Sequence, residues 1–232
     1  MKWKDNIIDS FVWGEIARRE EKERVARLIA AMVKDGDVVG IGSGSTSYLA
    51  LLTIAGRVKR EGLFVRAIPT SLEITMACAG LGIPVTNLEE NRPDWTFDGA
   101  DEIDPDLNLI KGRGGAMFRE KLLINSSPKT YIIADSSKRV ARLGEKFPVP
   151  VEVFPQALTY VGQALKELAP TDIRLRMAEG KDGPIITENG NLIVDVWFDG
   201  IPEGAEVALK SITGVIESGL FTGYAVEIVD AG

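Results

Sequence analysis

The chain has 232 residues, of which 45% are hydrophobic and 26% are charged, a balance that is ordinary for a globular protein with a sizeable core. Its formal net charge of −7 argues against a general binder of nucleic acid or of anionic membranes, because such proteins present a basic face. The single cysteine excludes an intramolecular disulfide, and the absence of histidine excludes histidine acid–base catalysis and histidine-ligated zinc. Carboxylates and lysines must therefore carry any proton transfer.

The N-terminal region does not show the pattern of a signal peptide. It lacks an uninterrupted apolar segment, and no stretch elsewhere in the chain approaches the length of a membrane span. We therefore expect a cytoplasmic protein. Residues 15–34 place apolar side chains at helical spacing, which predicts a helix with one buried face.

Apolar runs and helical patterns then alternate along the first two thirds of the chain. We predict strands at 35–42, 63–69, 83–88, 94–101 and 130–135, and helices at 45–56, 70–82, 113–125 and 136–144. Such alternation predicts βαβ units, hence a Rossmann-like α/β domain whose parallel sheet has helices on both faces.

The pattern changes at "FPVPVEVFP", a stretch punctuated by prolines near residues 147–155. Beyond it we predict a helix at 156–169, a strand at 172–178, a hairpin around Asn189-Gly190, a helix over 203–219 and a closing strand from 224. We therefore expect an α/β catalytic domain from residues 1–147 plus 214–232. A smaller α+β, ferredoxin-like domain, at 148–213, is expected to serve as a lid or in oligomerisation.

Four short polar segments follow predicted strands, and a fifth, "KGRGG", leads on from one of them. They are "GSGSTS" (42–47), "PTSLE" (69–73), "DGADE" (98–102), "KGRGG" (111–115) and "DSSK" (135–138). Ligands of open parallel sheets bind outside the carboxyl ends of the strands, so we expect all five segments to share one edge.

The first segment suits a phosphate group. Gly42 and Gly44 allow close approach to the backbone, Ser45 and Thr46 offer hydroxyls, and the helix that follows presents free N–H groups. It has neither the lysine of a P-loop nor the third glycine of a dinucleotide fingerprint. The alternative is a strand–helix turn that binds nothing.

The acidic segment "DGADEID" allows a metal site, an acid–base site or a solvated turn. Its spacing is not that of an EF-hand. A solvated turn fits Asp104 and Asp106 well, but it fits Asp98 and Asp101 less well, because they lie beside the end of an apolar strand. The role of Glu102 stays open.

The segment "KGRGGAMFRE" could supply an oxyanion hole, because a glycine run before a helix exposes several N–H groups. Glu120 lies in the helix that follows and Lys111 at the lip of the loop. A carboxylate near such donors and a lysine could abstract a proton. The alternative for Glu120 is an ordinary surface residue.

Several ordered blocks together resemble ribose-5-phosphate isomerase of the A type. They are "GIGSGST" (40–46), "PTS" (69–71), "DGADEID" (98–104), "IKGRGGAMFREK" (110–121), "IIADSSK" (132–138), "FPVPVEV" (147–153) and "TENGNLIVDV" (187–196). The resemblance implies reversible conversion of D-ribose 5-phosphate to D-ribulose 5-phosphate in the pentose phosphate pathway. It implies no metal or organic cofactor, and a homodimer or homotetramer.

The resemblance also assigns roles to residues. It makes Glu120 the base, and Lys111 with the N–H groups at Gly112, Arg113, Gly114 and Gly115 the donors to the enediolate oxygen. Asp98 and Asp101 would hold sugar hydroxyls and assist ring opening. The phosphate or nearby sugar would be bound by a further set, comprising Lys22, Ser43, Gly44, Ser45, Thr46 and Lys138. The role of the Arg113 side chain stays open, as does that of residues 1–20, which extend beyond the family's usual start.

Two other classes of function remain in view. A catalytically silent sugar-phosphate sensor would keep the phosphate loop but could discard the base and the lysine, whereas both are present here. An acyl-CoA or dinucleotide-binding α/β enzyme is disfavoured by the incomplete fingerprint at 40–47.

Overall fold

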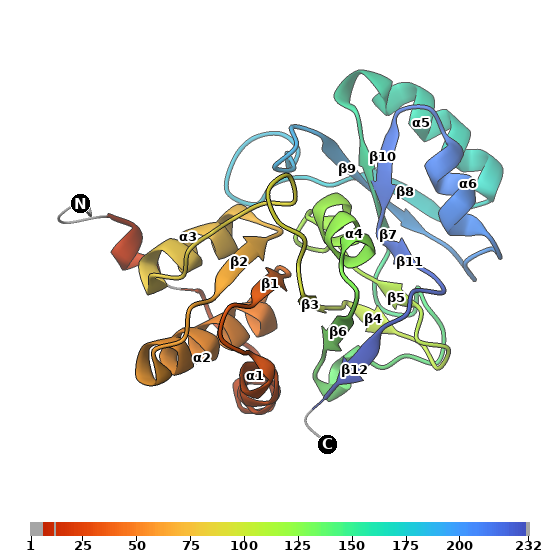
Figure 1. Cartoon of the computed structure of the whole chain (residues 1–232). Helices are drawn as coiled ribbons and strands as arrows, with labels where there is room; N and C mark the ends of the chain where they lie inside the picture. Colours follow the sequence, from red (N-terminus) through yellow and green to blue (C-terminus); the bar gives the residue numbers. More distant parts are fainter. Residues whose placement is uncertain (1–6, 12, 231–232) are drawn as a thin grey trace. The chain divides into compact units, whose positions relative to one another are not determined.

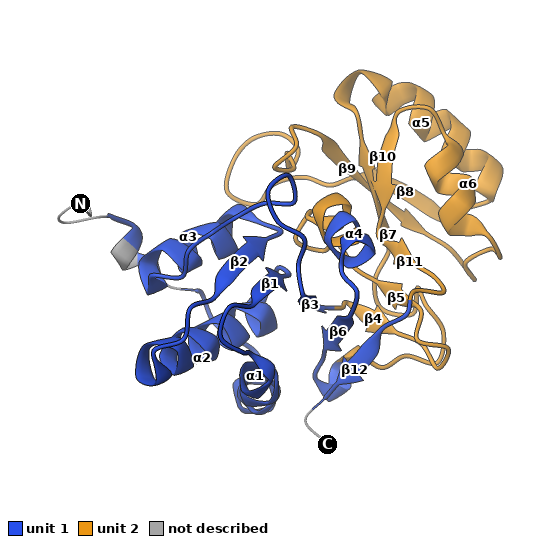
Figure 2. Cartoon of the chain, in the orientation of Figure 1, with its two compact units in different colours: residues 1–99, 122–137, 225–232 blue, residues 100–121, 138–224 orange. Residues whose placement is uncertain are grey.

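The computed structural model describes residues 7–11 and 13–230. They form two compact units, coloured separately in Figure 2. Unit 1 contains residues 1–99, 122–137 and 225–232, and unit 2 contains residues 100–121 and 138–224. Residues 100–121, 138–147 and 214–224 thus group with the second unit, whereas the sequence places them in the first domain. The predicted boundaries stay a prediction about independently folding domains.

Unit 1 is built on a five-stranded sheet in the order β12-β6-β3-β1-β2, and every neighbouring pair in it is parallel (Figure 1). Its strands are β1 (Val38–Ile41), β2 (Arg66–Pro69), β3 (Trp95–Gly99), β6 (Thr130–Ile133) and β12 (Glu227–Val229). Its helices are α1 (Arg19–Met32), α2 (Ser45–Glu61), α3 (Leu72–Leu81) and the end of α4 (Met117–Ser126). The predicted α/β class with a parallel sheet is confirmed.

Alternation along the strands explains why helices cover both faces of this sheet. Val39 and Ile41 of β1 join a core with side chains of α1, α2 and α3, whereas Val38 joins Ile68 and Leu123 of α4 on the other face. Gly40 points to the same side as Leu123, and a Cβ there would lie 2.9 Å from the Leu123 side chain. The same Cβ would lie 2.5 Å from Thr96 Oγ1 and 2.8 Å from Thr96 Cβ in the neighbouring strand β3, so glycine at this position makes room for Thr96 and for α4.

The N-terminal segment packs against α2. A short 3-10 helix, η1 (Ile7–Ser10), precedes Phe11, whose ring meets Tyr48 edge-on at a centroid distance of 6.1 Å. The Trp13 ring stacks on Tyr48 at 5.1 Å. Tyr48 lies in the first turn of α2, directly after the "GSGSTS" segment. The predicted first helix begins at Arg19 rather than near residue 15, after Arg18 in the left-handed conformation (φ 51°).

Unit 2 carries an antiparallel four-stranded sheet in the order β10-β7-β9-β8. Its strands are β7 (Val149–Val153), β8 (Asp172–Leu175), β9 (Leu192–Trp197) and β10 (Val215–Ser218). Helices α5 (Leu158–Ala164) and α6 (Ala205–Ser211) pack on it, with 3-10 turns η3 (Pro155–Ala157) and η4 (Leu165–Leu168). This is the small α+β architecture that the sequence predicts beyond residue 147.

A second sheet in unit 2 is one that the pattern does not predict. Strands β4 (Glu102–Ile103), β5 (Leu109–Ile110) and β11 (Leu220–Phe221) form an antiparallel sheet in the order β11-β5-β4. Each strand has two residues, too few for a visible period, and β11 comes from a distant part of the sequence. The remaining short element is η2 (Ser136–Lys138).

Four predicted elements are wrong in part. Residues 83–88 contribute only an isolated bridge, at Val85, and the run before Asn189-Gly190 contributes only bridges at Pro184 and Ile186, so the hairpin has one full strand. The helix predicted over 203–219 ends at Ser211, because Gly214 (φ 95°) reverses the chain into β10. The helix predicted at 136–144 is the single turn η2.

Candidate active site

Four of the five polar segments follow strands of one parallel sheet. Strands β1, β2, β3 and β6 run in the same direction, so the segments after them start at one edge, as predicted. The segment "KGRGG" differs, because it follows β5 of the small antiparallel sheet in unit 2. This segment therefore does not follow a strand of the parallel sheet, and its position at the shared edge stays a prediction.

The loop after β1 is shaped by two glycines. A Cβ at Gly42 would lie 1.9 Å from the carboxyl carbon of Asp98, so only glycine lets this buried carboxylate lie against the loop. Gly44 adopts φ 92° directly before α2. Thr46 and Ser47 are buried in the first turn of that helix. The Asp98 carboxylate that lies against the loop accepts the N–H of Gly99 at Oδ1, at 2.7 Å. The loop and Asp98 therefore form one packed group.

Lys22 of α1 reaches this same loop. Its Nζ donates to Ser45 Oγ at 3.0 Å and lies 3.9 Å from Asp135 Oδ2, at the end of β6. Ser43 and Thr70 join the ends of β1 and β2 through a 2.8 Å hydroxyl contact. A buried lysine, serine hydroxyls and the start of a helix thus gather in unit 1, a combination that suits a phosphate group.

Unit 2 contains a buried pair of opposite charges. Lys111 Nζ lies 3.3 Å from Glu120 Oε2, and their side chains are 2% and 5% exposed. Lys111 follows β5, and its N–H donates to the carbonyl of Gly219, where a Cβ would lie 2.1 Å from the Lys111 carbonyl oxygen. Glu120 lies in the first turn of α4, where its N–H donates to the Ala116 carbonyl. The alternative of a surface glutamate is therefore wrong for Glu120.

The glycine loop between them is a tight turn. The Gly115 N–H donates to the Gly112 carbonyl at 3.0 Å, and both glycines have positive φ, 83° and 96°. The Arg113 N–H donates to Asp101 Oδ2 at 3.0 Å. Two of the four predicted donors thus have acceptors within the protein. The N–H groups of Gly112 and Gly114 have none among the residues that the structure describes.

The acidic segment divides into residues with different surroundings. Asp104 accepts from the N–H groups of Asp106 and Asn108, the behaviour expected of a turn residue. Glu102, which the sequence left open, is fully buried. It accepts three backbone N–H groups, from residues 144, 146 and 147, at 2.6–2.8 Å. Glu102 therefore fixes a loop, which its sequence position alone could not reveal.

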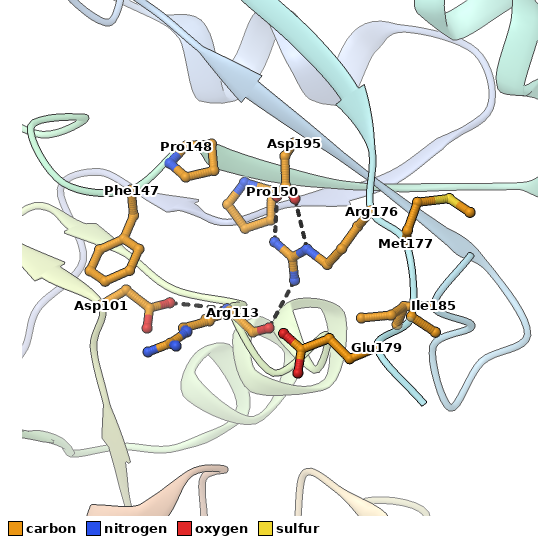
Figure 3. Close-up of a pocket in the computed structure, with 11 residues that line it drawn as sticks. Asp101, Arg113, Phe147, Pro148, Pro150, Arg176, Met177, Glu179, Ile185 and Asp195 are labelled. Atoms are coloured by element: carbon orange, nitrogen blue, oxygen red, sulfur yellow. Dashed lines mark hydrogen bonds and ion pairs between the residues drawn. The ribbon is translucent and has the colours of Figure 1, made fainter. Parts of the chain in front are cut away.

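A pocket in unit 2 opens beside the glycine loop (Figure 3). It has a volume of about 510 Å³ and is lined by residues that include Asp101, Arg113, Arg176 and Asp195. The Arg113 guanidinium and the Lys138 ammonium both lie over the Phe147 ring, at 5.6 and 5.8 Å from its centroid. Lys138 thus contacts an aromatic ring in unit 2.

Sequence reasoning missed two charged groups in unit 2. Arg176 binds Asp195 and the carbonyls of the glycine loop, while Lys121 binds Glu206, Glu217 and the Leu220 carbonyl. Arg176 lies in an alternating strand pattern in which a charged residue is expected to face solvent. Lys121 was visible only as part of the block "FREK". Neither pattern shows which distant partners they meet.

Three further features concern the single cysteine, possible metal ligands and possible membrane-spanning helices. Cys78 is fully buried, and burial raises the pKa of its thiol to about 12, as expected of a small core residue rather than a nucleophile. Within residues 7–11 and 13–230, no three His, Cys, Asp or Glu side chains are grouped so that they could hold a metal ion. No helix in that part of the chain is both long and apolar enough to cross a bilayer.

The parallel sheet with its helices and the smaller antiparallel unit define the fold as that of an α/β enzyme. A family model described as ribose 5-phosphate isomerase A (phosphoriboisomerase A) matches residues 66–232. The chain belongs to the ribose-5-phosphate isomerase A family.

Individual relatives from the same family are similar to this chain over most of its length. The chain is 46% identical over 202 residues to ribose-5-phosphate isomerase A of Methanothermobacter thermautotrophicus, which covers 86% of this chain and 88% of the relative. The solved ribose 5-phosphate isomerase A of Methanocaldococcus jannaschii superposes with a TM-score of 0.87 at 39% identity, covering 92% of this chain and 96% of that one. A D-ribose-5-phosphate isomerase solved in complex with phospho-erythronic acid gives the same TM-score at 36% identity, with the same coverage.

Proposed function

We propose that this chain interconverts D-ribose 5-phosphate and D-ribulose 5-phosphate in the non-oxidative pentose phosphate pathway. Family membership supports the reaction, and the complex of one solved relative with phospho-erythronic acid supports a sugar-phosphate site. We further propose that Glu120 is the base, that the reaction passes through an enediolate, and that no metal or organic cofactor takes part.

The buried Lys111–Glu120 pair carries this proposal. At 3.3 Å, the ammonium and the carboxylate are close enough to interact strongly, and both are almost fully removed from solvent. A buried charge pair is a poor source of stability, since desolvation offsets much of the attraction. Its position at the two ends of a glycine loop is better explained by chemistry that uses a base and a cation together.

The reaction needs a base next to a carbonyl. From the open-chain aldose, Glu120 would take the proton on C2 while negative charge develops on O1. Return of that proton to C1, with movement of the O2 hydroxyl proton to O1, gives the ketose. Lys111 and the N–H groups of Gly112 and Gly114 would stabilise the charge on the enediolate oxygen, each donor contributing about 3–4 kcal/mol.

Unit 1 would supply most of the recognition, and Asp101 and Lys138 of unit 2 would add to it. We propose that Lys22, Ser45 and Thr46 bind the phosphate, with Ser43, Gly44 and Lys138 assigned to the phosphate or nearby sugar. Support comes from the 3.0 Å contact between Lys22 Nζ and Ser45 Oγ at the start of α2. Asp98 and Asp101 would hold sugar hydroxyls and assist ring opening. Asp101 would do so while Oδ2 accepts the Arg113 N–H, so its other oxygen is the one assigned to the sugar.

Turnover of ribose 5-phosphate, measured in excess chelator, tests the activity. We expect ribulose 5-phosphate to form at the same rate with and without chelator. Loss of activity in chelator, restored by added metal, would contradict the cofactor-free route. Binding of ribose 5-phosphate without turnover would instead indicate a sugar-phosphate sensor.

Glu120→Gln tests the base. Loss of a general base is expected to lower kcat by about 10²–10⁴-fold, because the amide cannot accept the C2 proton. Glu167→Gln is the matched control, since Glu167 is an exposed carboxylate of the same unit and should leave kcat unchanged. Full activity in Glu120→Gln would overturn the assignment even if the wild type were active.

A cytoplasmic location, a homodimeric or homotetrameric assembly and movement of the small domain as a lid belong to the same proposal. Light scattering of the purified protein tests the assembly, and a monomeric mass would contradict it. Hydrogen exchange with and without ribose 5-phosphate tests the lid. Equal protection over residues 148–213 in both states would count against closure.

A further inference from the structure

Arg176 holds the glycine loop by its carbonyl groups. One nitrogen, Nη1, donates to the Gly112 carbonyl at 3.0 Å and to the Arg113 carbonyl at 2.8 Å. Figure 3 shows the guanidinium between Asp195 and the backbone of Arg113, in the wall of the pocket beside the loop. Arg113 and Gly114 form the exposed tip of this loop, and a charged donor on two successive carbonyls anchors that tip to the rest of unit 2.

Arg176 is itself fixed in place. Its Nε donates to Asp195 Oδ2 at 2.8 Å and its Nη2 donates to Asp195 Oδ1, a two-pronged pairing in which both side chains are less than 15% exposed. Asp195 lies in the middle of β9, and the Arg176 N–H donates to the carbonyl of Ile193 in the same strand. The guanidinium therefore takes its position from the four-stranded sheet.

Because Arg176 fixes the carbonyls of Gly112 and Arg113, it also fixes the direction of the N–H groups in the same peptide planes. In a trans peptide, the C=O of one residue and the N–H of the next lie in one plane and point in opposite directions, and the described part of the chain has no cis peptide. Fixing the Gly112 carbonyl orients the Arg113 N–H, which donates to Asp101. Fixing the Arg113 carbonyl orients the Gly114 N–H away from Arg176. The positive charge also polarises both peptide groups and strengthens their N–H donors.

We propose that Arg176, held by Asp195, is a positioning residue that sets the Gly114 N–H as a donor to the reaction's developing oxyanion. This rests on the proposed isomerase function. Arg176 does not touch the substrate in this proposal, and it acts through one peptide plane. The proposal also accounts for the position of Arg113 in the loop. The Arg113 carbonyl accepts from Arg176, the Arg113 N–H donates to Asp101, and the Arg113 side chain lies over the Phe147 ring.

Arg176→Gln is the first test. We expect kcat to fall by about 10²-fold with KM nearly unchanged, because the lost interaction is one made mainly in the transition state. Arg174→Gln is the matched control: Arg174 lies two residues earlier, in β8, pairs with Asp172 and is 70% exposed, and kcat should not change. The folded fraction of each variant is measured by thermal unfolding, and rates are given per folded protein.

Arg176→Lys provides a second test of the positioning role if Arg176→Gln does not fold. A lysine keeps the charge but cannot bind Asp195 with two parallel bonds while reaching two carbonyls, so kcat should lie between the values of the wild type and the Gln variant. Unchanged kcat per folded protein in either variant, or a loss that falls on KM alone, would overturn the proposal. Failure of the wild type to isomerise ribose 5-phosphate would instead overturn the proposed function.

Discussion

The two units contribute different chemistry from different kinds of backbone. Unit 1 offers hydroxyls, helix N–H groups and Lys22 at the ends of parallel strands, where donors collect because strands end and helices begin. Unit 2 offers a buried Lys111–Glu120 pair at a glycine loop that follows an antiparallel strand. Under the proposed function, unit 1 supplies most of the binding and unit 2 supplies the proton transfer, so substitutions should separate KM from kcat.

The largest expected effect is on chemistry in unit 2. Lys111→Met is expected to lower kcat by about 10²–10³-fold, because it removes one donor to the enediolate oxygen and leaves Glu120 buried beside an apolar group. Steady-state kinetics with ribose 5-phosphate provide the measurement. Lys166→Met, which alters an exposed lysine of the same unit, should be silent. If the loss appeared in KM with kcat preserved, the division of labour would be wrong.

The next effect tests binding in unit 1. Lys22→Met is expected to raise KM about 10–100-fold with little change in kcat, because a charge-assisted hydrogen bond contributes about 1.5–3 kcal/mol. Inhibition by inorganic phosphate should weaken in parallel, which a folding defect alone would not produce. Arg27→Gln, an exposed site on the same helix, is the control. A fall in kcat at constant KM would place Lys22 in the chemistry instead.

Low pH should lower the free energy of unfolding through a carboxyl group of unit 2. Burial opposes ionisation of Glu217, but Lys121, the Ser218 N–H and Lys210 together hold the pKa of this carboxyl in unit 2 below its ordinary value. A lowered pKa stabilises the folded state above the ordinary value of 4.5, and that stability is lost as pH falls through the folded pKa.

Glu217→Gln should therefore flatten the fall in unfolding free energy below pH 4.5, measured by denaturant titration at several pH values. Glu227→Gln changes a carboxylate of unit 1 whose side chain is 60% exposed, and it should leave the slope as in the wild type. An equal slope for wild type and Glu217→Gln would contradict the role given to Lys121.

The smallest effect concerns the support of the phosphate loop. Trp13→Leu keeps an apolar side chain but removes the ring stacked on Tyr48, so we expect a loss of about 0.5–1.5 kcal/mol in unfolding free energy. Tyr48 lies in the first turn of α2, and KM should rise slightly while kcat stays constant. Ile7→Ala, at a side chain that is 85% exposed, is the control. A stability unchanged by Trp13→Leu would show that the N-terminal segment contributes no support.

Much of unit 1 follows from local pattern. Strands β1 and β3 are short apolar runs that end in polar segments, and "GSGSTS" before a helical pattern predicts a loop suited to phosphate. The run at 83–88 shows the limit of this reasoning. Its composition suits a strand, but it makes only a single bridge, to Ala67 of β2.

Unit 2 depends more on partners that are distant in sequence. Strand β11 pairs with β5 from more than 100 residues away, and no local signal in a two-residue strand predicts that pairing. Lys121 and Arg176 have ordinary positions in the sequence, and only their contacts reveal a structural ion cluster and a hold on the glycine loop.

The sequence by itself determined the family, the alternation of strands and helices, and the residue types available for chemistry, because these depend on local order and composition. Only the tertiary structure decided what each charge does. Glu102 and Glu120 are both buried glutamates, yet one accepts three backbone N–H groups and the other faces a lysine. The physical reason is that a carboxylate's role depends on the donors around it, and folding brings those donors from distant segments.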